Sequence, residues 1–442
     1  MGSAPRMDWN KLLDAARYGR GSESSDIRSP FQRDIDRIMF SDHFRRLARK
    51  TQVHPLNEND HIHSRLTHSL EVASVGKSLG ELAGVFLAEL GELPGKLGPR
   101  DVGEAVQAAC LAHDIGNPPF GHSGESAIKD WFANHPEAMD QIPYECRADF
   151  TKFDGNAMAI RILLNTGFYR QGMSPTHAVA GALLKYPWPS SFDAGKDKFS
   201  YFQTEARAVQ AIADRLGLID KGGHYARHPL AFLMEAADDI CYRIIDMEDA
   251  TELGILPERF MFDHFAEPLG LTDEPGEYDW PALHFRQRNS ILRAKLIHRA
   301  TNETAEIFKK HYEPIMNGEF DHTISLMGLS EGISRAIYTV YKGIEDQLFL
   351  SRRKIILELG AQNVIGTLLD LTMAEAKKIC TGEPSTNKQK VSILLGESIV
   401  ESIVNEPADC HYKIMMAIVD YVSGMTDHYA TDLCRKFMGL GF

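Results

Sequence analysis

Apolar residues recur at helical spacing along almost the whole chain. In segment after segment they return every three or four residues, which places them on one face of an amphipathic helix. Strand-like alternation is scarce, and residues 148–154 are the one short hairpin that the pattern suggests. The pattern predicts an all-α fold with helices near 31–51, 64–91, 101–114, 124–134, 154–166, 175–185, 204–216, 229–252, 287–313, 329–346, 348–359, 361–377, 390–404 and 407–422.

Glycine- and proline-rich breaks separate these helices without marking a clear linker. They lie at 91–100, 186–198, 217–229 and 265–280, and we interpret them as loops. We expect a core at 1–280 and a helical C-terminal cap at 281–442 that completes the pocket and the oligomer contacts. The core then holds three polar motifs, at 64–72, 109–125 and 229–246.

Composition narrows the class of protein. A chain of 442 residues with 43% hydrophobic content can bury a large core. A net charge of -13 argues against indiscriminate nucleic-acid coating, so positive potential must be confined to a pocket. We find neither a run of about 18 apolar residues nor a signal-peptide pattern, which favours a soluble cytoplasmic protein with no membrane association. Six scattered cysteines without a Cys-x-x-Cys motif favour reduced thiols over a disulfide framework.

The most informative feature is the pair His113-Asp114, which closes an apolar stretch and precedes Gly116-Asn117-Pro118. An imidazole nitrogen and a carboxylate oxygen can ligate one divalent cation together. An isolated His-Asp pair is more often a helix end or a turn. A metal site therefore requires further ligands elsewhere in the chain.

One candidate ligand is His68, upstream of the pair. Leu66, Leu70 and Val72 recur at helical steps, so His68 lies near the inward face of that helix. The alternative is a buried structural histidine bonded to a backbone carbonyl. His61 and His63 precede the periodic region, and we place them on the pocket rim or on a solvated loop.

A second candidate is one of two adjacent acids in the helix predicted at 229–252. Asp238, Tyr242 and Asp246 are four residues apart and share one face. Asp239 lies on a neighbouring face, where Arg243 can pair with it. We therefore predict Asp238 as the ligand and Asp239 as a surface salt-bridge residue. An error of one residue would exchange the two roles.

The set His68, His113-Asp114 and Asp238 resembles the H…HD…D signature of the HD superfamily of metal-dependent phosphohydrolases. Within it, the chain resembles the deoxyguanosine triphosphate triphosphohydrolase-like (dGTPase-like) family. The HD pair alone is weak evidence for this family, but the run from His113 to Glu125 is strongly specific for it. The shared stretches are 44–53, 65–69, 113–122 with Glu125, 184–187, 235–239 and 424–427. The family often has a basic residue after Met-Thr-Asp, where this chain has His428, which puts phosphate binding by that segment in doubt.

The resemblance implies a reaction. A deoxynucleoside triphosphate is hydrolysed at the α-phosphorus to the deoxynucleoside and inorganic triphosphate. The four ligands would hold a divalent cation, whose identity among Mg²⁺, Mn²⁺, Fe²⁺, Co²⁺ and Ni²⁺ stays open. His122, with Glu125 holding its tautomer and orientation, matches the general acid–base dyad, and which of the two acts on the water and which on the leaving 5′-oxygen stays open. The alternative for His122 is a structural residue at a helix start.

The same resemblance implies a set of substrate contacts. Arg65 and Lys185 would neutralise phosphate charge, although either can be an ordinary surface cation. A tyrosine ring placed where a 2′-hydroxyl would lie excludes ribose, although Tyr242 can equally be a core aromatic. The implied substrate-binding residues are Gln52, Arg65, Asn117, Lys185, Tyr242 and Asp246.

Family resemblance also implies partners: a dNTP substrate, a dNTP activator, single-stranded DNA as a further candidate, and a homo-oligomer, often a hexamer. Base preference stays open, with dGTP favoured. Two other interpretations remain. One is another HD-type nucleotide phosphohydrolase, and the other is a non-catalytic sensor that binds dNTP or single-stranded DNA.

Overall fold

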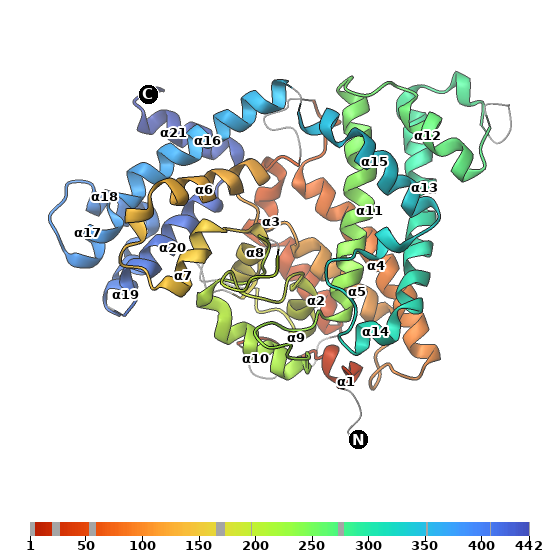
Figure 1. The fold of residues 1–442 in the computed structure, drawn as a ribbon, viewed down its shortest axis with the longest axis horizontal. Helices are drawn as coiled ribbons and strands as arrows, with labels where there is room; N and C mark the ends of the chain where they lie inside the picture. Colours follow the sequence, from red (N-terminus) through yellow and green to blue (C-terminus); the bar gives the residue numbers. More distant parts are fainter. Residues whose placement is uncertain are drawn as a thin grey trace.

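The computed structural model describes residues 5–19, 27–52, 59–164, 173–195, 197–272, 278–350, 352–406 and 408–441. Throughout this part the chain is helical, and its only β pairing is a set of isolated bridges. The all-α prediction is confirmed (Figure 1). Residue 53, which ends one of the quoted motifs, and the expected end of the helix 154–166 lie outside the described residues.

Two helices that pack closely against each other lie at the centre of the first part of the fold. They are α4 (Arg65–Glu89) and α5 (Pro99–Ala112). Their close approach depends on glycine, because a Cβ added at Gly80 would lie 2.8 Å from the Gly103 Cα atom. Helix α11 (Pro229–Glu252) crosses this pair, and α13 (Phe285–Lys310) packs on α4 and α11. The three polar motifs are thereby brought to neighbouring helices.

The buried apolar side chains form two separate clusters. The first core joins α4, α5, α11 and α13 with α15 (Ile333–Phe349). The second core joins α6 (His122–Asn134) with the C-terminal helices α16 (Arg352–Met373), α20 (Cys410–Ser423) and α21 (Asp427–Phe437). Figure 1 shows α16 to α21 gathered beside α6 and α7, away from α13 and α15. The division at residue 280 stays a proposal, since each core draws on both sides of it.

Shorter helices connect these elements. They are α1 (Trp9–Leu12), α2 (Pro30–Met39), α3 (Asp42–Arg46), η1 (Leu47–Arg49), η2 (Pro136–Met139), α7 (Tyr144–Thr151), α8 (Gly155–Leu164), α9 (His177–Leu183), η3 (Gln203–Glu205), α10 (Ala206–Leu216), α12 (Phe260–Leu269), η4 (Trp280–Ala282), α14 (Tyr312–Met316), η5 (Leu326–Leu329), α17 (Ala376–Thr381), α18 (Lys388–Leu395) and α19 (Glu397–Val404).

The hairpin expected at 148–154 is wrong, because α7 runs through most of that segment. Phe150, on α7, and Phe153, just after the helix ends, are both buried in the second core. Other differences concern helix ends. The helix expected at 390–404 breaks at Gly396, whose φ of +91° other residues rarely adopt. The helix α12 was not predicted.

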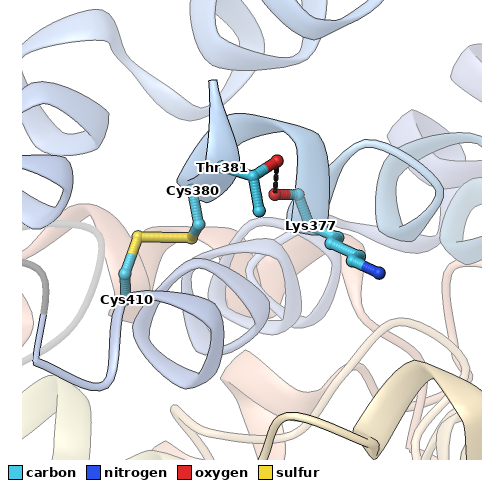
Figure 2. The surroundings of a disulfide bond; sticks show 4 residues. All are labelled: Lys377, Cys380, Thr381 and Cys410. Atoms are coloured by element: carbon cyan, nitrogen blue, oxygen red, sulfur yellow. Dashed lines mark hydrogen bonds between the residues drawn. A yellow bond between two sulfur atoms is a disulfide. The ribbon is translucent and has the colours of Figure 1, made fainter. Parts of the chain in front are cut away.

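Cys380 and Cys410 form a disulfide, which corrects the expectation that all thiols are reduced. Figure 2 shows the bond joining α17 to α20, beside the hydrogen bond from the Thr381 hydroxyl to the Lys377 carbonyl. The sequence gives no local sign of this pair, since the two cysteines are 30 residues apart and meet only because α17 packs on α20. Cys110 and Cys241 are free and buried in the first core.

One helical stretch in the described part, Lys354–Thr381, is long and apolar enough by composition to cross a membrane. The stretch is not an unbroken apolar run, since Glu358 and Asp370 lie within it. A single stretch of this kind is weak evidence for a membrane span, because core helices pass the same test.

Candidate active site

A cavity of about 680 Å³ lies where the two cores meet. Its walls come from the start of α4, the end of α5, the first turns of α6, the face of α11, and the α15–α16 region. The cavity brings together eleven of the twelve predicted site residues, and His68 lies directly behind it, against Asp238. The lining members are Gln52, Arg65, His113, Asp114, Asn117, His122, Glu125, Lys185, Asp238, Tyr242 and Asp246.

The four predicted metal ligands converge. His68, in the first turn of α4, places its Nε2 atom 3.1 Å from Asp238 Oδ1. His113 ends α5, and its Nε2 atom lies 3.6 Å from both Asp238 Oδ1 and Asp114 Oδ1. One ligand atom from each of His68, His113 and Asp114 falls within 4.8 Å of the others. This geometry can hold one metal ion.

The surroundings of His113 suit a metal ligand. Its Nδ1 atom lies 2.6 Å from the Cys110 carbonyl oxygen, so we assign the ring proton to Nδ1. The Nε2 lone pair then points toward the carboxylates, and this buried atom has no hydrogen-bond partner among the described residues. Metal-bound histidines commonly donate their other N–H to a carbonyl in this way. Two imidazoles with two carboxylates are a donor set suited to a divalent first-row cation or Mg²⁺.

Asp114 is fixed by two neighbours. Arg65 donates from Nη1 to Asp114 Oδ2 at 2.9 Å, and the Asn117 side chain donates to Asp114 Oδ1. Burial alone would favour the neutral acid, but the Arg65 guanidinium holds the pKa of Asp114 below its usual value. Arg65 and Asn117 thus support the ligand cluster, while their contact with substrate stays a prediction.

The two residues of the expected dyad lie in the first turn of α6. His122 is exposed to the cavity, and desolvation by the surrounding walls lowers its pKa, so the imidazole is neutral at neutral pH. Burial disfavours ionised Glu125, but Lys198 and His122 lower the pKa of that carboxyl. Glu125 accepts from the Gly155 amide at 2.9 Å and lies 3.4 Å from Lys198 Nζ. Both oxygens therefore have partners besides His122, and the orienting role of Glu125 stays a prediction.

The backbone that presents His122 has an uncommon conformation. Phe120 and Gly121 both have positive φ, at +64° and +57°. Such a value costs energy for a phenylalanine and persists only where surrounding contacts enforce it. At Gly121 a Cβ would lie 2.5 Å from Arg65 Nη2, so a larger residue would displace that guanidinium.

The predicted substrate residues lie further along α11 and opposite it. Lys185 Nζ is 3.8 Å from Asp238 Oδ2, next to the ligand cluster. Tyr341 on α15 donates its hydroxyl to Asp246 at 2.8 Å and packs edge-on against Tyr242. Burial raises the pKa of Asp246 to about 7, despite that hydrogen bond. Tyr242 thus contacts Tyr341 and also lines the cavity.

The Asp239 prediction is half correct. Asp239 does pair with Arg243, at 3.0 Å, but it is buried rather than on the surface. The reason is that the Ser325 loop covers this face of α11, and the Ser325 hydroxyl donates to Asp239. Arg243 also stacks over the Tyr242 ring, with its guanidinium carbon 4.5 Å from the centroid.

His61 and His63 lie away from the ligand cluster, as expected, and line a separate hollow of about 180 Å³. His63 is not solvated, because it contacts Asp249 at 2.7 Å and Glu71 at 3.5 Å. Those two carboxylates raise the pKa of His63 to about 10 although burial opposes it.

Several cavity residues were missed by sequence reasoning. Lys198 and Arg227 come from loops, and Tyr341 and Lys354 from helices of the C-terminal half. Their positions are set by tertiary contacts, such as the ion pair of Arg227 with Glu235 at 2.5 Å. The matching charges are visible in the sequence, but nothing local singles out these four.

A helical fold with this cluster of histidines and carboxylates defines an HD-type hydrolase, and residues 65–153 match the family model described as HD domain. The chain belongs to the deoxyguanosinetriphosphate triphosphohydrolase-like family. A protein of that name from Pseudomonas aeruginosa is 40% identical over 450 residues, covering 98% of this chain and 99% of the relative. One from Synechocystis sp. is 34% identical, covering 98% and 100%. The deoxyguanosinetriphosphate triphosphohydrolase of Cronobacter sakazakii is 30% identical, covering 98% of each chain.

Proposed function

We propose that this chain hydrolyses a deoxynucleoside triphosphate, with dGTP as the first candidate, to the deoxynucleoside and inorganic triphosphate. The observation that carries the proposal is the convergence in one cavity of the ligand cluster, the neutral histidine His122 and a group of cations that includes Arg65, Lys185 and Lys198. Relatives named for hydrolysis of deoxyguanosine triphosphate support the substrate class. Water attacks the α-phosphorus, and the bond to the nucleoside 5′-oxygen breaks.

His68, His113, Asp114 and Asp238 would hold a divalent cation. Mg²⁺, Mn²⁺, Fe²⁺, Co²⁺ and Ni²⁺ are all compatible with these donors. When bound, such an ion polarises a phosphate oxygen and makes a water molecule more acidic. The side chains Arg65 and Asn117 keep Asp114 oriented toward it.

His122 is the proton carrier of this proposal. Since its imidazole is neutral near pH 7, it can accept a proton from the attacking water and return one to the 5′-oxygen. The ionised Glu125 stabilises the imidazolium that forms in between. Arg65, Lys185 and Lys198 face the same cavity and balance the charge of the triphosphate.

The sugar lies against Tyr242 and Asp246 in this proposal, with Gln52 opposite. The Tyr242 ring is held from behind by Tyr341 and Arg243, so it cannot easily turn away from a 2′-hydroxyl. Steric exclusion of ribose follows from that rigidity. Gln52 offers a hydrogen bond to the 3′-hydroxyl, and Asp246 contacts the sugar beside Tyr242.

A panel of four dNTPs and four NTPs with Mg²⁺ or Mn²⁺ tests the function, with nucleoside and triphosphate separated as products. We expect triphosphate from one or more dNTPs and little from NTPs. Phosphate or pyrophosphate instead would indicate another HD-type phosphohydrolase. Binding without turnover under every metal would indicate a sensor of dNTP or single-stranded DNA. Equal turnover of ribonucleotides would refute the role of Tyr242.

We further propose a cytoplasmic homo-oligomer, a hexamer by family resemblance, with a dNTP activator or single-stranded DNA as additional ligands. The core at 1–280 and the cap at 281–442 belong to this proposal. Ile355, Ile356 and Leu359 on α16 support a contact with a second copy, because they are exposed on one face of the helix. Light scattering of Ile356→Glu beside the unmodified chain tests it, and an unchanged mass would contradict it.

A further inference from the structure

The C-terminal helix α21 reaches the active site without lining it. The last residue along the chain that lines the cavity is Glu358, whereas α21 begins at Asp427. The Asp427 side chain is only 1% exposed. A carboxylate that is buried so completely must have strong partners, because its desolvation is costly.

Those partners belong to two walls of the cavity. Asp427 Oδ1 accepts from the Phe120 amide at 2.9 Å. Asp427 Oδ2 accepts from the Thr51 amide at 3.1 Å and from the Thr51 hydroxyl at 2.8 Å. Hydrogen bonds to an ionised acceptor are roughly twice as strong as neutral ones. One side chain therefore ties together two segments that are far apart in sequence.

Each tied residue stands next to a site residue. Phe120 has a positive φ and is two residues before His122, while Thr51 directly precedes Gln52. The Phe120 ring is buried in the second core, and its amide is held by Asp427 from the C-terminal half. A strained backbone of this kind relaxes when the contact that enforces it is removed.

A second contact reinforces the first. The buried Lys50 ammonium group donates to the Asn117 carbonyl and, at 3.0 Å, to the Ser423 carbonyl. Burial lowers the pKa of Lys50 to about 7, and the nearby Asp427 carboxylate opposes that shift. The loop that follows His113-Asp114 is thus held at both Asn117 and Phe120 by the segment around residues 423–427.

An ordinary capping role does not account for Asp427. Its helix is already capped by Thr426, whose side chain accepts from the Tyr429 amide. The Asp427 carboxylate bonds instead to the other two segments.

We propose that Asp427 is a positioning residue, which sets His122 and Gln52 for the reaction without touching the substrate. This inference rests on the proposed function for its catalytic consequence. It assigns to the C-terminal half a direct part in the geometry of the site.

The test compares Asp427→Ala and Asp427→Asn with the control Asp432→Asn, an exposed carboxylate on the same helix that pairs with Lys436. Hydrogen–deuterium exchange is read on peptides covering 118–125 and 50–52. Activity is read as kcat and KM per folded molecule, and metal content is measured separately. Asparagine keeps the shape and can still accept one amide, so it remains usable if the alanine variant does not fold.

We expect the rate of hydrogen–deuterium exchange in residues 118–125 to rise at least about tenfold in Asp427→Ala, because the hydrogen bond from the Phe120 amide to Asp427 is lost. The value of kcat falls about 10- to 100-fold through misplacement of His122, while metal content stays unchanged. Asp427→Asn gives smaller shifts in the same direction, and Asp432→Asn gives none. Thr51→Val removes the hydrogen bond from the Thr51 hydroxyl to Asp427 and, because Thr51 adjoins Gln52, raises KM about fivefold.

Wild-type exchange at 118–125 together with wild-type kcat per folded molecule would overturn the inference. Uniformly faster exchange in both cores with unchanged kcat would also overturn it, since that is the signature of lost global stability alone. If the unmodified protein hydrolyses no nucleotide, the proposed function fails, and the exchange data still decide whether Asp427 holds the loop.

Discussion

The two walls of the cavity are built differently. On one wall His68, His113 and Asp238 project from α4, the end of α5 and the middle of α11, all within the first core. On the other, His122 follows a backbone with two positive φ angles and depends on α6 and the second core. The first wall is set by regular helices, and the second by contacts between distant segments.

The direction of a side chain is thus set by nearby sequence on the first wall and by contacts between distant segments on the second. A ligand on a helix is aimed by the 3.6-residue period, so its direction is a property of nearby sequence. A histidine after a strained loop is aimed by whatever holds the loop, here Asp427 and Lys50 from outside the motif. Changes that act on one wall should therefore leave the other intact.

The largest expected effect is on the ligand wall. Asp238→Asn should abolish metal binding and lower turnover more than about 10³-fold, because even indirect partners of a metal cost 10- to 100-fold. The matched variant is Asp239→Asn, which breaks the buried pair with Arg243 and lowers stability. Metal content by mass spectrometry should separate them. Retained metal in Asp238→Asn with loss in Asp239→Asn would exchange the two assignments.

The wall that carries the metal ligands could be predicted from the sequence, because the helical period determines where its side chains point. Spacing alone chose Asp238 over Asp239, and the structure places Asp238 against both histidines. Spacing could not reveal that Asp239 is buried, since its cover is the Ser325 loop, 86 residues away. Lys198 and the Cys380–Cys410 bond escaped for the same reason, because each depends on segments that meet only in the folded chain. Asp427 ends a stretch shared with the family, but spacing could not reveal its bonds to Phe120 and Thr51.

A second test acts on the other wall. His122→Ala should lower kcat about 10²- to 10³-fold, the usual range for loss of a general acid–base group. Metal content should not change, because His122 is not among the ligand atoms that cluster. The measurement is kcat with metal analysis on the same sample. Loss of metal in His122→Ala would show that the two walls are not independent.

A change at Asp246, on the cavity face of α11, should affect stability and turnover in opposite directions. Its pKa of about 7 lies above the ordinary 3.8, so the folded state holds its proton more tightly than the unfolded chain. Its contribution to stability is therefore full below pH 4 and is lost as pH rises toward 7. Asp246→Asn should remove a cost of up to about 4 kcal/mol at pH 8 and little at pH 4.

Thermal unfolding of Asp246→Asn at pH 4 and pH 8 measures this, with turnover followed in parallel. The Tm should rise at pH 8 while turnover falls. An equal change in Tm at both pH values would show that the carboxyl is not held protonated.

The smallest expected effect is the loss of stability on reducing the Cys380–Cys410 disulfide, which lies in the second core. Closing a loop of 30 residues, the Cys380–Cys410 bond should contribute about 3 kcal/mol to the free energy of unfolding. Reductant should lower the Tm of the unmodified chain and leave that of Cys380→Ser unchanged. Cys110→Ser, in the first core, should keep the response to reductant. An identical Tm with and without reductant would mean that the bond does not form.

Hydrolysis of a dNTP in H₂¹⁸O tests the central claim most directly, because both walls are required to deliver water to the α-phosphorus. The account predicts one ¹⁸O atom in the inorganic triphosphate and none in the nucleoside, read by mass spectrometry. Label in the nucleoside 5′-hydroxyl, or in released phosphate or pyrophosphate, would contradict it.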